Sequence, residues 1–466
     1  MYIDKAALFT DYYELTMAQG YFLQGKHNDS AVFDYFFRKN PFNGGFVVFA
    51  GLEELIETVI NLRFDDEALQ WLAAEGFHKD FIAWLSDFQF RGSIRSAREG
   101  DVVFPNQPVL IAEGPLLDVQ IIETLLLNIL NYQSLVATKA ARMRYAAGPE
   151  ATLLDFGLRR AQGLGGIHAT RSAIIGGFNG TSNVYAAHRF GVSAGGTMAH
   201  SWIQSFDSEI DAFRAYAQHF PDQTILLVDT YDTLKSGIPN AITVADELQE
   251  KGHQLKAVRL DSGDLAYLSK KSRDMLDTAD HFDVKIAVSN QLDEKVIASL
   301  IAQGAPIDIF GVGTQLVTGG DSPALDGVYK LAECNGTPRI KISDNVEKIT
   351  LPGRKTVRRY TNPDGTLHGD AIGLLEDDPF DQIHDPAFPA RKTDVTTLDG
   401  RELLTTVIQD GKRQAEPQSI GDSANFVQQA MRNLTDEYKR FENPHIYKVG
   451  VTRKLLRLRN QLIEGQ

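Results

Sequence analysis

The stretch Ala257-Val-Arg-Leu-Asp-Ser-Gly-Asp264 is the most informative part of this chain. Its apolar residues predict a buried strand, yet the strand carries Arg259 and ends at Asp261. Charged groups at the end of a buried strand are costly unless something pairs with them. In parallel α/β folds, ligands bind at the carboxyl ends of the strands. The stretch therefore predicts one edge of an active site.

The surrounding segment alternates short apolar runs with helical patterns. The runs span residues 152–156, 224–228, 255–260, 284–288 and 307–310, and the helical patterns span residues 169–176, 183–190, 208–219, 242–251, 265–279 and 293–302. Strands and helices that alternate in this way are typical of a parallel sheet, open or closed into a barrel. No Gly-x-Gly-x-x-Gly turn opens a helix after the first strand, so we expect a barrel rather than a dinucleotide-binding sheet.

The flanking segments have other patterns. The first 90 residues or so are mainly helical, with strand-like runs at 32–38 and 46–49, and residues 91–113 predict a small antiparallel sheet with tight turns. Asp118 is expected to cap a long apolar helix that reaches about Ala146. Beyond the barrel, residues 341–359 are basic, residues 364–385 are acidic and rich in turn formers, and residues 424–462 are helical.

Composition narrows the class of protein. The 466 residues include 47 Lys and Arg against 61 Asp and Glu, a net charge of −14, which argues against a nucleic-acid partner held by bulk charge but not against a local basic pocket. Cys334 is the only cysteine, which excludes an intrachain disulfide and suggests a reducing compartment. Neither a signal peptide nor a membrane span is evident, so we expect a cytoplasmic protein.

The carboxyl ends of the predicted strands form a set. They read Asp155-Phe-Gly157, Asp229-Thr-Tyr-Asp232, Asp261-Ser-Gly-Asp264, Ser289-Asn290 and Gly311-Val-Gly-Thr314. A single Asp at such a place is often only the N-cap of the next helix, and this alternative stays open for Asp232 and Asp264. Three carboxylate ends, an Asn end and a glycine-rich end on consecutive strands instead predict a mouth with carboxylates for Mg²⁺ or another cation and a glycine-backed phosphate site.

Three further features have two interpretations each. His200 follows a glycine pair in the loop 193–201 and is either a hydrogen-bonded core histidine or an acid/base or phosphoryl acceptor. Phe156 either belongs to the core or stacks on a flat heteroaromatic ligand. The turn with Thr181 and Ser182 either caps a helix or contacts ligand.

Taken in order, these motifs closely resemble the bacterial nicotinate phosphoribosyltransferase family, from Leu8 to about Lys355. The matching segments are Thr10-Asp-Tyr-Tyr-Glu-Leu-Thr-Met-Ala-Gln19, Phe36-Phe-Arg-Lys-Asn-Pro-Phe42, Ala50-Gly-Leu52, Asp155-Phe-Gly-Leu-Arg-Arg-Ala161, Gly196-Thr-Met-Ala-His-Ser201, Val228-Asp-Thr-Tyr231, Val258-Arg-Leu-Asp-Ser-Gly-Asp264 and Phe310-Gly-Val-Gly-Thr314. So many motifs in the same order make the resemblance to this family specific.

The resemblance implies an α/β fold of the type II phosphoribosyltransferase class, an irregular α/β barrel beside an open-sandwich α+β domain. We expect the sandwich to use residues 1–135 and 336–466, and the barrel residues 136–335. The implied reaction joins nicotinate to 5-phosphoribosyl 1-diphosphate, and releases nicotinate mononucleotide and diphosphate. The family also implies Mg²⁺ bound with the diphosphate, ATP as a co-substrate that phosphorylates a histidine, and a homodimer with shared active sites.

Residue roles follow from the same resemblance. His200 is similar to the phosphorylated histidine, Asp229 to the carboxylate that orients it, and Asp261 to the carboxylate that faces the ribose. Nicotinate would lie between Phe156 and Tyr13 of a partner subunit, near Arg159 and Arg259, with Thr181, Ser182 and Ser201 close by. The predicted phosphate contacts are Ser289, Asn290, Gly311, Gly313, Thr314, Lys355 and a partner's Arg38.

Position 182 bears on the substrate. The amide-using relative, nicotinamide phosphoribosyltransferase, has an aspartate there that accepts a hydrogen bond from the amide, whereas this chain has Ser182. A carboxylate would repel nicotinate, so the serine favours the acid. Alternatives are the amide-specific enzyme, quinolinate phosphoribosyltransferase, whose chain is shorter and lacks the histidine loop, and a non-catalytic metabolite-binding homologue.

Overall fold

The computed structural model describes residues 6–343, 349–377, 380–388 and 390–465. It divides into two compact units, one formed by residues 1–138 and 324–466 and the other by residues 139–323. We call the first the sandwich unit and the second the barrel unit. The first five residues, on which the absence of a signal peptide was judged, and parts of the basic and acidic segments (344–348 and 378–379) lie outside the described residues.

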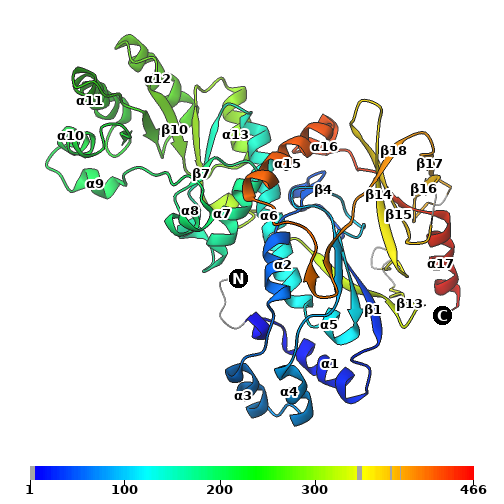
Figure 1. Ribbon diagram of the computed structural model, residues 1–466. Coiled ribbons are helices and arrows are strands. Elements are labelled where there is room, and N and C mark those ends of the chain that lie inside the picture. Colours follow the sequence, from blue (N-terminus) through cyan, green and yellow to red (C-terminus); the bar gives the residue numbers. More distant parts are fainter. Residues whose placement is uncertain (1–5, 344–348, 378–379, 389, 466) are drawn as a thin grey trace. The chain divides into compact units, whose positions relative to one another are not determined.

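The barrel unit is built around six parallel strands (Figure 1), in the order β7-β6-β11-β10-β9-β8. Its strands are β6 (Thr152–Asp155), β7 (Gly180–Thr181), β8 (Ile225–Leu227), β9 (Ala257–Leu260), β10 (Lys285–Ser289) and β11 (Ile309–Val312). Its helices are η3 (Leu158–Arg160), α7 (Gly165–Ile175), α8 (Val184–Phe190), α9 (His200–Gln204), α10 (Glu209–His219), η4 (Thr233–Gly237), α11 (Ile238–Glu250), α12 (Leu265–Thr278), α13 (Glu294–Ala302) and α14 (Thr314–Val317). The predicted alternation of strands and helices is confirmed.

The two faces of each barrel strand have different surroundings. Leu153, Phe310, Ile286, Val258 and Leu226 are fully buried on one face. On the alternate positions, side chains such as Leu154, Ala287 and Ile309 line a cavity inside the unit. Both faces are therefore covered, which explains why these strands read as continuous apolar runs. Strands β7 and β8 are the two ends of the hydrogen-bonded order, and this makes the barrel irregular.

The sandwich unit contains a seven-stranded sheet (β13-β12-β1-β5-β3-β19-β20), a six-stranded sheet (β17-β16-β21-β15-β14-β18) and the pair β2-β4. Its strands are β1 (Ser30–Phe37), β2 (Val47–Val48), β3 (Ser93–Ser96), β4 (Val102–Val103), β5 (Leu110–Pro115), β12 (Gly327–Cys334), β13 (Thr337–Pro338), β14 (Lys355–Thr361), β15 (Leu367–Leu374), β16 (Gln382–His384), β17 (Lys392–Asp394), β18 (Asp399–Glu402), β19 (Thr405–Gln409), β20 (Lys412–Arg413) and β21 (Val449–Val451). Segments from both ends of the chain thus share sheets, as expected.

The helices of the sandwich unit come mainly from the two ends of the chain. They are η1 (Ala6–Leu8), α1 (Tyr12–Leu23), η2 (Pro41–Asn43), α2 (Leu52–Ile60), α3 (Asp66–Ala74), α4 (Lys79–Ser86), α5 (Leu116–Gln120), α15 (Ile420–Asn433), α16 (Asp436–Lys439) and α17 (Arg453–Glu464), and α6 (Glu123–Ala147) begins here. Within the described residues, every helix is too short or too polar to cross a membrane.

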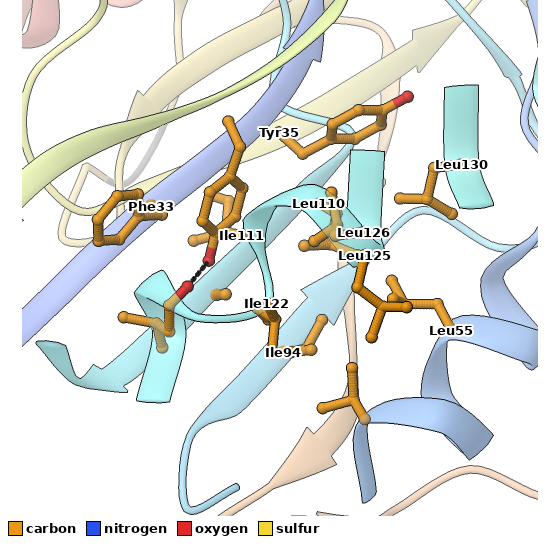
Figure 2. Packing of buried hydrophobic residues seen from close by; sticks show 14 of the residues in the cluster. Phe33, Tyr35, Leu55, Ile94, Leu110, Ile111, Ile122, Leu125, Leu126 and Leu130 are labelled. Carbon is orange, nitrogen blue, oxygen red and sulfur yellow. Dashed lines mark hydrogen bonds between the residues drawn. The ribbon is translucent and has the colours of Figure 1, made fainter. Parts of the chain in front are cut away.

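The core of the sandwich unit lies between its large sheet and its helices. Figure 2 shows Tyr35 of β1 and Leu110 of β5 on the side of the sheet that carries Leu125 and Leu126 of α6, and all four are at most 2% exposed. The dashed line marks a buried hydrogen bond of 2.8 Å from the Tyr329 hydroxyl to the carbonyl oxygen of Val119. The bond anchors β12 to α5, so this polar tip is satisfied inside an apolar core.

Three expectations differ from the structure. Asp118 does not cap the long helix, because it lies within α5, where its carboxylate accepts three hydrogen bonds from Arg91. Residues 324–335, expected in the barrel, contribute β12, which pairs with β1 in the sandwich unit. Residues 424–462 are not continuously helical. Between α16 and α17 the chain forms strand β21, which joins the six-stranded sheet.

A buried carboxylate on α1 makes the stability of the sandwich unit sensitive to pH. Glu14 is fully buried and accepts a hydrogen bond from Gln120, whose amide also reaches Glu123 at 3.4 Å. Burial raises the pKa of Glu14 from 4.5 to about 7. Because the pKa is raised in the folded state, the stability that this group contributes is present below pH 4.5 and is lost as the pH rises through 7.

We therefore expect Glu14→Gln to remove part of the pH dependence of folding. Between pH 5 and pH 8, the free energy of unfolding of the natural chain should fall by about 2 kcal/mol more than that of the variant. Urea unfolding at the two pH values measures this difference. The exposed Glu57 serves as the control, since Glu57→Gln should leave the pH dependence unchanged. Equal pH dependence in all three proteins would contradict the assignment.

Candidate active site

The barrel strands end at one edge of the parallel sheet, and this edge collects the polar residues. Strand β6 ends at Asp155 and β10 at Ser289, while Asp229 and Asp261 follow β8 and β9. Neighbouring strands are in parallel register, for example Leu227 beside Arg259 and Ala287 beside Arg259. The carboxyl ends therefore meet, as the sequence predicted.

Arg259 is the centre of this edge. Its Nε donates to Ser289 Oγ (2.9 Å), its Nη1 to Thr197 Oγ1 (3.0 Å) and the Met198 carbonyl oxygen (3.4 Å), and its Nη2 to Asp261 Oδ1 (3.0 Å). The side chain is only 13% exposed. These four hydrogen bonds use four of the five guanidinium N–H groups, which leaves one for a ligand.

Asp261 and Asp229 have different hydrogen-bond partners at this edge of the sheet. Asp261 accepts from Arg259 and from the Ser289 hydroxyl through Oδ1. Asp229 accepts from the backbone N–H of Asp261 (2.8 Å) and from the hydroxyl of Ser262 (2.6 Å), both through Oδ2. Among the described residues, the buried Oδ1 of Asp229 has no hydrogen-bond partner. Asp229 thus fixes the backbone turn that carries Asp261.

His200 lies at the first position of helix α9 and reaches the same edge. Its Nδ1 is 3.0 Å from Thr230 Oγ1, and its Nε2 is 3.9 Å from Asp261 Oδ2. The resemblance gave the orienting role to Asp229, whereas the contact on Nδ1 in this structure comes from the next residue, Thr230. Helix α9 is held by Trp202, whose indole N–H donates to the carbonyl oxygen of Ala212 on α10 (3.1 Å).

Phe156 forms a flat wall beside Arg259. The Arg259 guanidinium lies 5.6 Å from the centroid of the Phe156 ring. A Cβ atom at Gly311 would lie 2.5 Å from that ring, so only glycine lets the ring lie against β11. These residues line a cavity of about 350 Å³ together with Thr197 and the Gly195–Gly196 pair. Such a cavity suits a small planar anion.

Thr181 and Ser182 have separate roles. Asp155 is buried, and its Oδ2 accepts hydrogen bonds from Thr170 (2.7 Å) and Thr181 (2.8 Å), while burial raises its pKa. The Thr181 hydroxyl is therefore used inside the protein. Ser182 is exposed and bonds the carbonyl oxygen of Asp155 (3.2 Å). Asn183, rather than Thr181 or Ser182, caps α8, because its Oδ1 accepts from the backbone N–H of Ala186.

The predicted phosphate residues follow β10 and β11. The Ser289 hydroxyl is buried and engaged with Arg259 and Asp261. Asn290 is exposed and has a left-handed backbone (φ 85°), which is uncommon for a residue other than glycine and is often found at functional sites. Gly313 precedes α14, and Thr314 is exposed at its first position.

The remaining strand-end residues divide into caps and exposed groups. Asp264 caps α12 by accepting from the Tyr267 N–H (3.0 Å), and Asp232 caps η4 by accepting from the Leu234 and Lys235 N–H groups (3.2 and 2.9 Å). The structure therefore supports the helix-cap interpretation that had been left open for both. Arg159 and Ser201 are exposed on η3 and α9.

Three predicted residues belong to the sandwich unit. Tyr13 is 47% exposed on α1. Arg38 follows β1, and its Nε has no hydrogen-bond partner within the described part of the chain. Lys355 is fully buried, and its ammonium pairs with Asp34 (2.9 Å). Their predicted contacts with phosphate or pyridine stay predictions.

The interpretation of the sequence missed Thr230, Thr197, Thr170 and Ser262. Thr230, Ser262 and Thr197 stand inside motifs that were recognised, next to Asp229, Asp261 and Gly196, so adjacency was an available signal. Thr170 had no such signal, because it belongs to none of those motifs and its partner is Asp155 on another element. Among the described residues, no group of three or more His, Cys, Asp or Glu side chains is arranged to hold a metal ion.

Comparisons with known proteins agree over nearly the whole chain. Residues 8–131 match the nicotinate phosphoribosyltransferase N-terminal domain, residues 151–382 the nicotinate phosphoribosyltransferase family, and residues 354–459 its C-terminal domain. The chain is 44% identical over 460 residues to a nicotinate phosphoribosyltransferase of Bacillus subtilis (strain 168), covering 96% of this chain and 93% of the relative. A relative from Bos taurus with the same name is 36% identical over 517 residues, covering 98% and 96%.

Solved structures share the fold. The crystal structure of human nicotinic acid phosphoribosyltransferase superposes with a TM-score of 0.89 at 33% identity, covering 98% of this chain and 100% of that chain. A nicotinate-nucleotide pyrophosphorylase from Pyrococcus furiosus superposes with a TM-score of 0.73 at 24% identity, covering 93% and 98%. The expected fold, a barrel with a second sheet domain, is thereby confirmed.

We expect Gly311→Ala to displace the Phe156 ring, because the new methyl group would overlap it. Overpacking of this kind costs about 1–3 kcal/mol, and urea unfolding measures the loss. Gly195→Ala is the matched control, since its Cβ would lie 3.7 Å from the nearest atom, an ordinary contact. Equal stability of the two variants would show that the ring does not need the glycine.

Proposed function

Because the chain belongs to the nicotinate phosphoribosyltransferase family, we propose that it joins nicotinate to 5-phosphoribosyl 1-diphosphate. The products are nicotinate mononucleotide and diphosphate. The observation that carries this proposal is the 350 Å³ cavity, whose wall holds the Phe156 ring next to the Arg259 guanidinium, which in turn pairs with Asp261. A flat aromatic face and an enclosed cation are the two features that an aromatic carboxylate needs.

The cavity residues suit alignment rather than proton transfer. Pyridine nitrogen attacks the ribose carbon with its own lone pair, so the reaction needs no general base. We propose that the ring stacks on Phe156 and that the remaining N–H of Arg259 donates to the nicotinate carboxylate. Holding the nitrogen in line with the bond that breaks lowers the entropic part of the barrier.

We propose that Asp261 stabilises the cation that develops. Departure of diphosphate leaves positive charge on the ribose ring, and a fixed carboxylate nearby lowers the energy of that state. Oδ1 of Asp261 is held by Arg259 and Ser289, while Oδ2 lies towards His200. We propose that Oδ2 is the oxygen that faces the ribose.

We further propose that turnover is coupled to ATP through a phosphohistidine at His200. In this step Nε2 attacks the γ-phosphorus, the bond from phosphorus to the bridging oxygen breaks, and ADP leaves; water later hydrolyses the phosphohistidine. Nε2 must carry no proton for the attack, so Nδ1 carries it. Thr230 Oγ1, 3.0 Å from Nδ1, can accept that hydrogen bond.

The proposed reaction also involves a metal ion and a second subunit. When bound with the diphosphate, Mg²⁺ would neutralise charge on the leaving group. Oδ1 of Asp229, which has no hydrogen-bond partner among the residues that the structure describes, is an oxygen ligand of the kind Mg²⁺ prefers, and this fits a metal carried by the substrate. We also propose a cytoplasmic homodimer in which a partner supplies Tyr13 and Arg38 to the site.

The substrate choice is tested at Ser182. The purified chain should convert nicotinate, and not nicotinamide, in the presence of phosphoribosyl diphosphate and Mg²⁺. Ser182→Asp should raise KM for nicotinate about tenfold or more, because each 1.4 kcal/mol of repulsion between carboxylates is a factor of ten. Ser182→Asn is the neutral control and should stay close to the natural enzyme. Preference of the natural chain for nicotinamide would reject the proposed substrate.

The histidine step has its own test. After incubation with ATP, intact-mass and phosphopeptide analysis should find one acid-labile phosphate on His200, absent from His200→Gln. Thr230→Val should slow its formation about tenfold, because the shape is kept and the acceptor is lost. Thr230→Ser should restore the rate. Full phosphorylation of Thr230→Val would show that Thr230 does not position the imidazole.

A further inference from the structure

The residues from Thr197 to His200 connect two parts of the candidate active site, and we call them the strap. At one end, Nη1 of Arg259 donates hydrogen bonds to the Thr197 hydroxyl (3.0 Å) and to the Met198 carbonyl oxygen (3.4 Å). At the other end, Nδ1 of His200 is 3.0 Å from the hydroxyl oxygen of Thr230. The strap therefore joins the cation of the cavity to the imidazole of the sheet edge within four residues.

The strap limits what Arg259 can offer to a ligand. Both N–H groups of Nη1 point to the strap, while Nε donates to Ser289 and Nη2 donates to Asp261. A carboxylate is bound most strongly by two parallel N–H groups of a guanidinium. With the strap in place, Arg259 has one uncommitted N–H and cannot present such a pair. The strap thus competes with an anionic ligand for the same nitrogen.

The contact with the strap is the easiest one for Arg259 to exchange. Thr197 and Met198 offer neutral acceptors, and a hydrogen bond to a charged acceptor is about twice as strong. The Thr197 hydroxyl also donates to the Met198 carbonyl oxygen (3.2 Å), so it keeps a partner when it leaves the guanidinium. A Cβ atom placed on Gly196 would meet no described atom within 4 Å, so the chain before the strap has room to move. Exchange therefore leaves no buried group without a partner.

A negative charge on His200 would favour this exchange. Nε2 of His200 is 3.9 Å from Oδ2 of Asp261. A phosphoryl group on Nε2, as the proposed ATP step leaves it, would repel that carboxylate. Asp261 is held through Oδ1 by Arg259 and Ser289, so the repulsion acts mainly on the end of the strap that carries His200. Displacement of His200 would draw Thr197 away from the guanidinium, because three peptide bonds separate the two residues.

We propose that Thr197 is a self-inhibiting contact: it holds Arg259 in a state that binds nicotinate weakly, and a negative charge on His200 releases it. After release, Nη1 and Nη2 together bind the nicotinate carboxylate. Thr197 is a positioning residue, because it acts through Arg259. The inference rests on the proposed function for the substrate and for the phosphohistidine. It gives Thr197 a role that the resemblance did not supply.

The first test is calorimetric binding of nicotinate to the full chain without ATP. Thr197→Val keeps the shape of the side chain and removes the acceptor, so it should bind nicotinate about fivefold more tightly than the natural chain. Thr197→Ser restores the hydroxyl and should bind like the natural chain. Loss of an ordinary structural contact would weaken binding instead, so the direction of the change separates the two roles.

The second test compares KM for nicotinate with and without ATP at saturating phosphoribosyl diphosphate. ATP should lower KM of the natural chain about fivefold, within the usual range of coupling between two sites. Thr197→Val should start from the lower KM and respond to ATP by less than about twofold. Ser193→Ala is the matched control, since Ser193 is exposed in the same loop and is not among the described partners of Arg259. It should keep both the natural affinity and the response to ATP.

Unchanged or weaker binding of nicotinate by Thr197→Val would overturn the inference, and so would an equal gain in Ser193→Ala or in Thr197→Ser. A full response to ATP in Thr197→Val would overturn it as well; thermal unfolding checks that the variants fold. Because the first test needs no turnover, a set of chains that binds nicotinate as expected but forms no nicotinate mononucleotide would reject the proposed function alone.

Discussion

The hydrogen-bonded pair of Arg259 and Asp261 is the constraint on which the candidate active site depends. A guanidinium that is 13% exposed at the end of a buried strand loses most of its hydration. Asp261, Ser289 and Thr197 replace that hydration with hydrogen bonds. These partners come from the turn after β9, from β10 and from the glycine loop, so pairing the charge also fixes three segments beside one cavity. A buried ion pair contributes little net stability, and its value lies in this fixed geometry.

The pair also explains the division of work between the two carboxylates. If Asp261 alone served Arg259, its position would depend on one flexible side chain. Asp229 holds the backbone N–H of Asp261 and the hydroxyl of Ser262, and so fixes the turn itself. His200 is then held from the other side by Thr230, the neighbour of Asp229. The segment that follows β8 thus positions both Asp261 and His200, although neither of them belongs to it.

Most of the barrel could be predicted from the sequence, because the signals for its strands and helices are local. Apolar runs bounded by helical patterns placed β6, β9, β10 and β11 within a few residues, and parallel strands bring their carboxyl ends together. Which side chains hydrogen-bond to one another within the site was harder to predict. The Thr181 hydroxyl turned out to bond Asp155, and Thr230 rather than Asp229 bonds His200. Such choices depend on side-chain directions across the sheet edge, which neither periodicity nor a motif records. The predicted helix caps were wrong for the same reason, because any nearby polar residue satisfies a cap pattern. Asn183, rather than Thr181 or Ser182, caps α8, and Asp118 lies buried within α5.

The two cation-lined cavities show how charge pairing selects the kind of anion. Arg259 is almost fully compensated, with one carboxylate and three other acceptors around it, so it can offer a single N–H to a small monoanion without a large excess of charge. A polyphosphate bound directly to Arg259 would find a single free donor beside the carboxylate of Asp261. The sandwich unit holds a cavity of about 1010 Å³ with the opposite balance, since six Lys and Arg side chains but two carboxylates line it among the described residues. Both of those acids already have local partners. An arginine with few carboxylates beside it can attract several negative charges, whereas a compensated arginine such as Arg259 is suited to one.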